Sequence, residues 1–151
     1  MKYLFKLKLM GVPSTMSLPI PSQLLSLELI WGRGFSSVQI NSSKLVRQLL
    51  KDQYKDTGSR PKRIPVDPSF KFSKEDCLFD DGTLSQEDRN MQKSYRSIAG
   101  MVIFLVTTCR IDLSYISTQL NRYMSKPGWK HYDAAQYMLS YLSGTVDLEI
   151  T

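Results

Sequence analysis

Residues 95–106 read Tyr-Arg-Ser-Ile-Ala-Gly-Met-Val-Ile-Phe-Leu-Val, and large apolar residues recur along this stretch at helical spacing. Four of them fall on one face of a helix: Tyr95, Ile98, Val102 and Leu105. Most of the other side chains in the stretch are apolar as well, which is typical of a helix that is buried on more than one side. The pattern predicts a mostly buried helix over residues 91–106.

Two further helices are predicted toward the C-terminus. Asp112 is a favoured N-cap residue, and the apolar stripe after it consists of Leu113, Ile116, Leu120 and Tyr123. The tripeptide Lys126-Pro127-Gly128 ends this second helix. A third helix is expected over residues 130–142, with Gly144 at its C-cap position and an inward stripe of Tyr132, Ala135, Leu139 and Leu142. The C-terminal part is therefore expected to be a three-helix bundle, followed at residues 146–150 by the start of a strand.

A β-hairpin and one helix are predicted nearer the N-terminus. Residues 25–31 and 35–40 have strand-like alternation, and Gly32-Arg33-Gly34 between them has the composition of a turn. Residues 13–24 are rich in Ser and Pro and are expected to be irregular. One of Asn41, Ser42 and Ser43 is expected to cap a helix over residues 44–54.

Charge divides the chain into basic and acidic blocks. Residues 44–63 carry seven basic and two acidic side chains, whereas residues 67–88 carry seven acidic and two basic ones. The net charge of +6 favours an anionic partner without identifying one. The acidic block lies in a stretch with few large apolar residues, so we expect a polar, acidic surface linker over residues 61–90.

Together these patterns indicate an α+β fold with four parts. A β-hairpin and helix region is expected over residues 1–60 and the linker over 61–90. A helical region follows over 91–145, and the start of a further domain over 146–151.

Composition excludes several kinds of protein. The two cysteines, Cys77 and Cys109, are too few for a disulfide scaffold or a four-cysteine zinc site. His131 is the only histidine, and its place near a helix start favours packing or capping over catalysis. The most apolar uncharged run, residues 97–109, is shorter than the ~20 residues that a membrane-spanning helix needs. We therefore expect an intracellular protein without a membrane partner, with the choice between cytoplasm and nucleus left open.

Five short motifs occur in a fixed order along the C-terminal part. They are Tyr95-Arg96-Ser97-Ile98-Ala99-Gly100, Arg110-Ile111-Asp112-Leu113, Arg122-Tyr123-Met124-Ser125-Lys126-Pro127, His131-Tyr132-Asp133-Ala134-Ala135 and Tyr141-Leu142-Ser143-Gly144-Thr145. Their order resembles the end of the reverse transcriptase region of copia-type retrotransposon Pol polyproteins, just before the ribonuclease H domain. The resemblance extends more weakly upstream, to about residue 24. Two departures are Ile111, where the family has proline, and Ser26, where it has glycine.

The resemblance implies a truncated segment that carries the connection to the polymerase thumb and the thumb-like helices. The family's metal-binding Tyr-x-Asp-Asp box would lie before this chain, and the ribonuclease H carboxylates after it. Phe79-Asp80-Asp81 has its aromatic residue directly beside the aspartates, in a polar stretch, and is better explained as a solvated turn ending at Gly82. We expect no catalytic residue, no metal ligand and no cofactor.

The resemblance also implies contact with a template–primer duplex. In the family, the hairpin before the thumb touches the primer terminus, which points here to Leu25 and Ser26. The first thumb helix lies along the minor groove of the duplex, and the corresponding positions are Ser97, Gly100, Met101 and Phe104. Glycine in mid-helix costs about 1 kcal/mol relative to alanine. Close approach to a nucleic acid and close packing against another helix are both possible reasons for Gly100.

A row of basic residues lies on one face of the helix predicted over residues 44–54. Lys44, Arg47 and Lys51 follow one another at three- and four-residue intervals, and Lys55 continues the row. These side chains are suited either to phosphate contacts or to solvating the helix face.

The leading functional hypothesis is a non-catalytic fragment of a copia-type reverse transcriptase with an ancestral role in gripping the template–primer duplex. One alternative is a subunit or part of an active RNA-directed DNA polymerase that another chain completes, and the remaining Pol domains are a candidate partner. Another is a small, basic nucleic-acid-binding module with an independent role.

Overall fold

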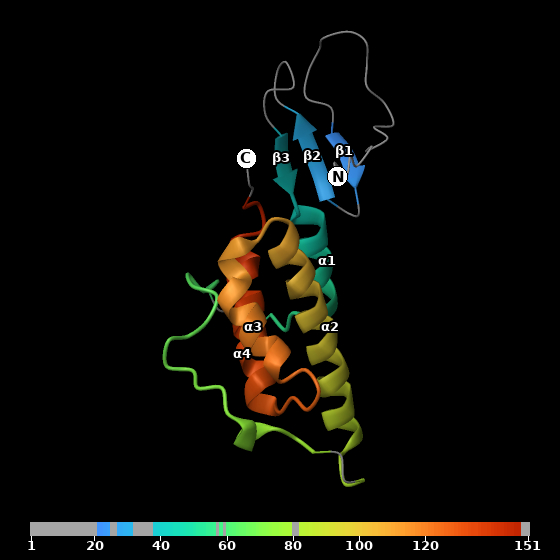
Figure 1. Ribbon diagram of the computed structural model, residues 1–151, viewed down its shortest axis with the longest axis vertical. Helices are drawn as coiled ribbons and strands as arrows, with labels where there is room; N and C mark the ends of the chain where they lie inside the picture. The colour runs from blue at the N-terminus through green and yellow to red at the C-terminus, as the bar shows by residue number, and fades with distance from the viewer. Residues whose placement is uncertain are drawn as a thin grey trace, which may run out of the picture.

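The chain has an α+β fold in a computed structural model, with a small sheet at one end and four α-helices packed below it (Figure 1). The structure describes residues 21–24, 27–31, 38–56, 58, 60–79 and 82–148. The predicted fold class is confirmed.

The sheet has three antiparallel strands in the order β1-β2-β3. Its strands are β1 (Pro21–Leu24), β2 (Leu27–Trp31) and β3 (Val38–Asn41). The predicted hairpin is β2 paired with β3, with Leu29 opposite Ile40. The expectation of irregular chain up to residue 24 was wrong for β1, which pairs along its length with β2. Proline is tolerated as the first residue of a strand, so pairing outweighs the local composition here.

Helix α1 (Ser43–Gln53) follows β3 almost directly. Its start is stabilised by the Asn41 side chain, whose Oδ1 accepts a hydrogen bond from the Ser43 backbone N at 2.6 Å. Val46 and Leu49 are buried in the core, so one face of the helix packs against the bundle.

Helix α2 (Gln86–Thr108) is the longest element and begins five residues before the predicted start at residue 91. Ser85 and Asp88 form a capping box, in which Ser85 Oγ accepts from the Asp88 backbone N and Asp88 Oδ2 accepts from the Ser85 backbone N, both at 3.1 Å. Two cap hydrogen bonds satisfy backbone groups that a helix start leaves free, and this fixes the start. The predicted stripe is buried at all four positions: Tyr95, Ile98, Val102 and Leu105.

A short 3-10 turn, η3 (Ile111–Leu113), leads into α3 (Ser114–Arg122). The prediction that Asp112 caps this helix was wrong, since Leu113 holds the N-cap position. The Asp112 carboxylate instead accepts hydrogen bonds from the buried Arg110 guanidinium at 3.0 and 2.8 Å. The predicted apolar stripe of this helix is buried throughout: Leu113, Ile116, Leu120 and Tyr123.

Helix α4 (Trp129–Gly144) packs against α1, α2 and α3 and buries its predicted stripe. Gly144 is its last helical residue rather than its C-cap, which is Thr145. A Cβ on Gly144 would lie 2.6 Å from Cβ of Pro61, so glycine here permits the close approach of another segment. Beyond the helix, residues 146–148 form a turn and irregular chain, and the remainder of the predicted strand lies outside the described residues.

The segment between α1 and α2 runs along the outside of the helices (Figure 1). It contains the short 3-10 helix η2 (Lys74–Asp76). Val66, Phe72 and Leu78 in it pack against the core, so this segment contributes apolar contacts as well as charge. Within the part of the chain that is described, no helix combines the length and the apolar character needed to cross a membrane.

Candidate nucleic-acid interface

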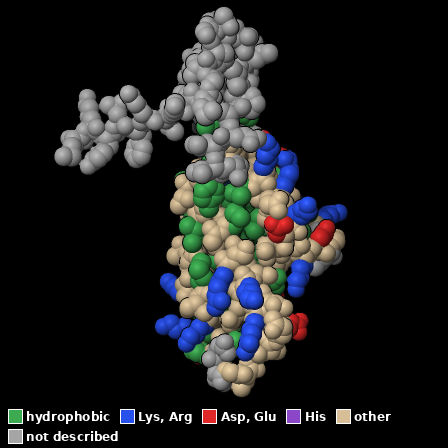
Figure 2. All heavy atoms as spheres, turned by 90° about the vertical axis from the view of Figure 1, so that its right-hand side faces the viewer, with side chains coloured by type: hydrophobic (Ala, Val, Ile, Leu, Met, Phe, Trp, Pro, Cys, Tyr) green, Lys and Arg blue, Asp and Glu red, His purple; other side chains and the backbone are tan. Residues whose placement is uncertain are grey.

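One face of α2 points away from the bundle along the length of the helix. It carries Arg89, Lys93, Ser97, Gly100 and Phe104, which follow one another at three- and four-residue intervals. The first four are exposed, and Phe104 is half-buried. Figure 2 views the molecule from this side, with Lys and Arg side chains over the lower part of the face and apolar side chains gathered higher up. We call these five residues the α2 face.

The family-derived candidates on α2 lie together on or beside this face. Ser97 and Gly100 are exposed, while Met101 and Phe104 are partly covered by neighbouring side chains. Ile103 adds further apolar surface, with 40% of its area exposed. The face therefore carries basic side chains in its N-terminal half, small residues in its middle and apolar side chains in its C-terminal half.

The surroundings of Gly100 bear on the two explanations that the sequence left open. A Cβ placed on this residue would meet no atom within 4 Å. Within the described chain, therefore, no other helix packs against Gly100, and a contact with nucleic acid stays a prediction. The glycine leaves the middle of the α2 face open to solvent.

Arg89 and Lys93 are functional candidates that the sequence did not reveal. Both are exposed, and neither side chain has an ion pair or hydrogen bond with the part of the chain that the structure describes. Arg89 was missed because the helix was expected to begin only at residue 91, whereas Lys93 lay inside the predicted helix on a face to which no role was given. The signal was present in the spacing of Ser85 and Asp88, the pattern of a capping box.

Arg96 lies close to the α2 face but is engaged within the protein. Its guanidinium donates to the backbone oxygens of Met124 at 3.1 Å and Ser125 at 3.0 Å. These hydrogen bonds tie α2 to the loop between α3 and α4, so Arg96 positions the helix.

The basic row on α1 differs from the cations of α2. The Lys44 ammonium pairs with Glu28 of β2 at 2.7 Å, and the Arg47 guanidinium pairs with Asp147 beyond α4 at 2.7 Å. Lys51 is exposed without such a partner among the described residues. Exposed ion pairs contribute at most about 1 kcal/mol. The structure thus assigns an acidic partner to two of the three α1 candidates.

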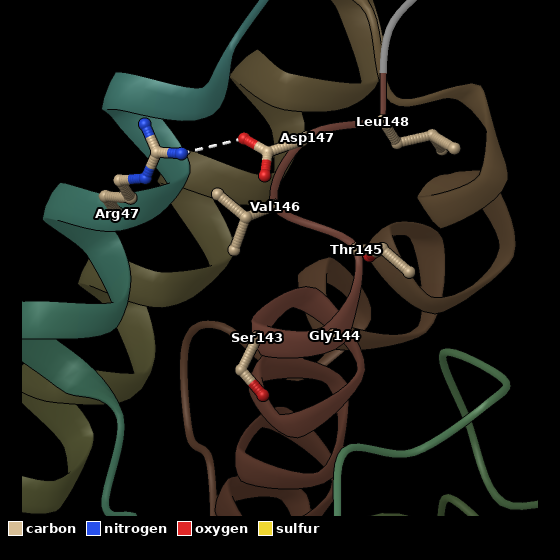
Figure 3. Close-up of a pocket in the computed structure, with 7 residues that line it drawn as sticks. All are labelled: Arg47, Ser143, Gly144, Thr145, Val146, Asp147 and Leu148. Atoms are coloured by element: carbon tan, nitrogen blue, oxygen red, sulfur yellow. Dashed lines mark hydrogen bonds and ion pairs between the residues drawn. The ribbon is translucent and has the colours of Figure 1, made fainter.

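A cleft of about 480 Å³ lies between α1 and the end of α4 (Figure 3). It is lined by Arg47 and by residues 143–148, and the Arg47–Asp147 pair spans it. Ser43 Oγ also donates to Asp147 Oδ1, at 3.1 Å, so two groups of α1 hold this carboxylate. The contacts join the chain after α4 to the start of α1.

His131 has a structural place at the start of α4. Its side chain is fully buried, with Nδ1 accepting from the Gly128 backbone N at 3.0 Å and Nε2 lying 3.0 Å from the Ser73 carbonyl. The neutral ring with its proton on Nε2 satisfies both contacts. Burial lowers the pKa of His131 below its usual value. The prediction that this residue packs and caps is confirmed.

Several sequence candidates cannot be placed. Leu25, Ser26, Asp80 and Asp81 lie outside the described residues. Among the residues that are described, no three His, Cys, Asp or Glu side chains are grouped so that they could hold a metal ion.

Comparison with known proteins relates the chain to two transposon polyproteins. It is 25% identical over 124 residues to the "Retrovirus-related Pol polyprotein from transposon TNT 1-94" of Nicotiana tabacum, a match that covers 82% of this chain and 9% of that protein. It is 43% identical over 53 residues to the "Retrovirus-related Pol polyprotein from transposon RE2" of Arabidopsis thaliana, covering 35% of this chain and 4% of that protein. The chain is similar in part to copia-type retrotransposon Pol polyproteins.

This similarity concerns a small part of much longer proteins. The matched region spans less than a tenth of either relative. No protein-family description matches the chain, and no solved structure is significantly similar to it. The resemblance to copia-type Pol is confirmed in this broad form, and the region of Pol to which the chain corresponds stays a prediction.

Proposed function

We propose that this chain is a non-catalytic, thumb-like part of a copia-type reverse transcriptase region, and that its α2 face binds the minor groove of a nucleic-acid duplex. The observation that carries the proposal is Gly100, a mid-helix glycine with open space around it on an exposed face. Its cost of about 1 kcal/mol to the helix is not offset by packing within the described chain.

The α2 face has the chemistry that a duplex surface requires. Arg89 and Lys93 lie one turn apart without an internal acidic partner and can each contact a phosphate. Ser97 supplies a hydroxyl that is able to hydrogen-bond sugar or base-edge atoms, and Gly100 leaves the helix backbone accessible. Met101 and Phe104 add apolar surface for contact with the sugars.

The shape of the surface favours an A-form duplex. A helix with its side chains is about 10–12 Å across, whereas the minor groove of B-form DNA is only ~6 Å wide. The minor groove of an A-form duplex is wide and shallow and presents 2′-hydroxyl groups. An RNA–DNA hybrid is therefore the preferred probe.

Fluorescence anisotropy with a labelled 20-base-pair RNA–DNA hybrid tests the proposal. Gly100→Leu fills the middle of the α2 face and is expected to weaken binding at least ten-fold. Because Gly100 is exposed and a Cβ there meets no atom within 4 Å, and because leucine favours the helix more than glycine does, the variant should melt no lower than the unsubstituted chain. Unchanged affinity in Gly100→Leu would contradict the proposal.

Charge variants supply the matched control. Arg89→Ala with Lys93→Ala should lower the log–log salt slope of duplex binding by about 0.9 for each lost phosphate contact. Arg122→Ala with Lys126→Ala removes equal charge from exposed positions off α2, at the end of α3 and after it. If the two double variants lose equal amounts of duplex affinity, the attraction depends only on the net charge of the chain. Magnesium-dependent nucleotide incorporation by the purified chain would overturn the non-catalytic assignment.

A further inference from the structure

The chain leaving α1 is held against α4, and it bends at Gly58, whose φ is +69°. We call its described residues, 54–56, 58 and 60–63, the basic strap. The Gln136 side chain fixes its beginning, because Nε2 donates to the Gln53 carbonyl at 2.9 Å and Oε1 accepts from the Lys55 backbone N at 3.1 Å. Pro61 lies against Gly144 at the other end of α4. The strap is thus anchored at two separated points on α4.

Two lysines of the basic strap stand over tyrosine rings of α4. The Lys55 ammonium lies 5.3 Å from the ring centroid of Tyr132, and the Lys62 ammonium lies 5.1 Å from that of Tyr137. Both lysines are nevertheless exposed. An ammonium has three N–H donors, so a cation that rests on a ring keeps donors available to a ligand on its solvent side.

The strap's positive charge is largely uncompensated. It has four cationic side chains and one acidic one, Asp56. The Asp56 carboxylate accepts from the Gly58 backbone N at 2.8 Å. Arg60 and Arg63 are exposed and have no acidic partner in the described part of the chain.

One acidic group close to the strap is already engaged. The positive charge of Lys62 attracts the Asp67 carboxylate. This carboxylate accepts hydrogen bonds from both the backbone N and the hydroxyl of Ser69, at 2.8 and 2.6 Å. These hydrogen bonds lower the pKa of Asp67, with the Lys62 charge adding to the effect. Ser69 thus supplies the hydrogen bonds to Asp67, and the Lys62 ammonium stays over Tyr137.

From this arrangement we propose that the basic strap is a second nucleic-acid-binding surface, which takes a single-stranded phosphodiester backbone. A positively charged track that follows the backbone is one feature by which proteins hold single strands. Here the buried Tyr132 and the half-buried Tyr137 position two of the cations of such a track. The described residues of the strap form no helix or strand that could enter a groove, whereas a flexible single strand can follow them. Anchoring of Lys55 and Lys62 over the rings reduces the side-chain entropy lost on binding.

The strap surface is separate from the α2 face. Figure 1 shows the later part of the strap beside α4, on the side of the molecule away from α2. The proposal therefore does not depend on duplex binding by α2. A chain with both surfaces would hold a duplex on one side and a single-stranded extension on the other.

Anisotropy titrations with fluorescein-labelled oligo(dT) of 20 nucleotides, at 50–200 mM salt, test this inference. The variant Arg60→Ala/Lys62→Ala/Arg63→Ala should bind at least ten-fold more weakly at 50 mM salt. Its log–log salt slope should fall by about 2, since each contact with a single strand contributes about 0.7. All three side chains are exposed, and the Lys62–Tyr137 contact contributes little to stability at an exposed site, so the melting temperature should fall only slightly.

A triple variant with the same charge change elsewhere is the control. Lys74→Ala/Arg122→Ala/Lys126→Ala removes three exposed cations that lie outside both surfaces, and it should leave oligo(dT) binding within about two-fold of that of the unsubstituted chain. If the two triple variants weaken oligo(dT) binding equally, the attraction reflects net charge and the proposal fails. It also fails if the unsubstituted chain does not bind oligo(dT) at 50 mM salt.

A charge-preserving variant and the hybrid duplex separate the remaining outcomes. Arg60→Lys/Arg63→Lys should keep most of the affinity if phosphate contact is the mechanism, and a loss as large as that of the alanine variant would contradict it. The strap variant should still bind the RNA–DNA hybrid. If the chain and all its variants fail to bind the RNA–DNA hybrid while oligo(dT) binding is intact, the function proposed for α2 is contradicted. The proposal for the basic strap is then still supported.

Discussion

The two ends of α4 are held by different kinds of buried polar side chain. Arg110 lies at the C-terminal end and His131 at the N-terminal end, and both are fully buried. Arg110 is a charge that needs an opposite charge, whereas His131 is a neutral ring that needs one donor and one acceptor. The comparison shows two ways in which a small bundle fixes a helix end.

At the C-terminal end, five hydrogen bonds converge on the Arg110 guanidinium and the Asp112 carboxylate. The guanidinium donates to both oxygens of Asp112, and to the Thr145 carbonyl and hydroxyl at 2.9 Å each. The Tyr141 hydroxyl donates to Asp112 at 2.9 Å. Burial acts to raise the pKa of Asp112, but the hydrogen bonds from Arg110 and Tyr141 outweigh it and lower that pKa. The ion pair therefore links the start of α3 to the end of α4.

At the N-terminal end, the contacts of His131 are made with backbone atoms. The ring joins Gly128, just before α4, to Ser73 in the segment between α1 and α2. It also stacks on Tyr123 with 4.2 Å between centroids. No charge is needed at this end, so the two ends should respond differently to substitution and to pH.

The largest expected effect is that of Asp112→Ala. Removing the carboxylate leaves the buried Arg110 charge without its counter-ion. Breaking a fully buried pair costs about 3–5 kcal/mol, and because the Asp112 side chain is 27% exposed we expect a loss near the lower end of that range. Urea denaturation measures the loss. The double variant Arg110→Met/Asp112→Ala should recover most of it, since an apolar side chain of similar length removes the stranded charge. A loss under about 1 kcal/mol in Asp112→Ala would mean that the buried guanidinium does not depend on this carboxylate.

His131→Phe should have a smaller effect. The ring shape and its stacking are kept, but the Gly128 N–H and the Ser73 carbonyl lose their partner, which costs about 1–3 kcal/mol. The same denaturation experiment measures the change. His131→Gln, whose side chain can both donate and accept a hydrogen bond, is the comparison variant. If His131→Gln lowers the free energy of unfolding more than His131→Phe does, the stabilisation comes from the ring stacking.

The smallest expected effect is the dependence of stability on pH between 7 and 5. Burial lowers the folded-state pKa of His131, so below about 6.5 the unfolded chain binds a proton more readily than the folded chain. Stability should therefore fall as the pH drops from 6.5 toward the folded pKa, by at most about 1.4 kcal/mol per pH unit. His131→Phe should lack this slope, because the chain has no other histidine. The lowered pKa of Asp112 adds a second loss only below about pH 3.8.

The sequence predicted the helices well because apolar periodicity is a local property. The stripes of Tyr95, Leu120 and Leu139 are buried as expected, and only helix ends moved. The misplaced end at Asp112 has a clear cause. A carboxylate that favours an N-cap in isolation also pairs with a guanidinium, and the buried Arg110 two residues earlier is the stronger partner.

Partners distant in the sequence were beyond local reasoning. Glu28 and Asp147 pair with the α1 cations from 16 and 100 residues away, and no spacing rule links such positions. Phe72 lies in a stretch without regular secondary structure, so its contact with the core left no periodic signal. The candidates on α2 do lie on or beside one face, because a face of a predicted helix is fixed by periodicity alone, and their role in binding stays a prediction.

The stack of His131 on Tyr123 has a spectroscopic consequence. An imidazole held 4.2 Å above a nearly parallel phenol ring, with an interplanar angle of 14°, lies in the shielding region of the aromatic ring current. With one histidine in the chain, the ring protons of His131 give a single pair of imidazole resonances, shifted upfield in a proton NMR spectrum. Movement of the ring away from Tyr123 would return those resonances to their random-coil positions, so this residue reports the docking of its end of α4 without an added label.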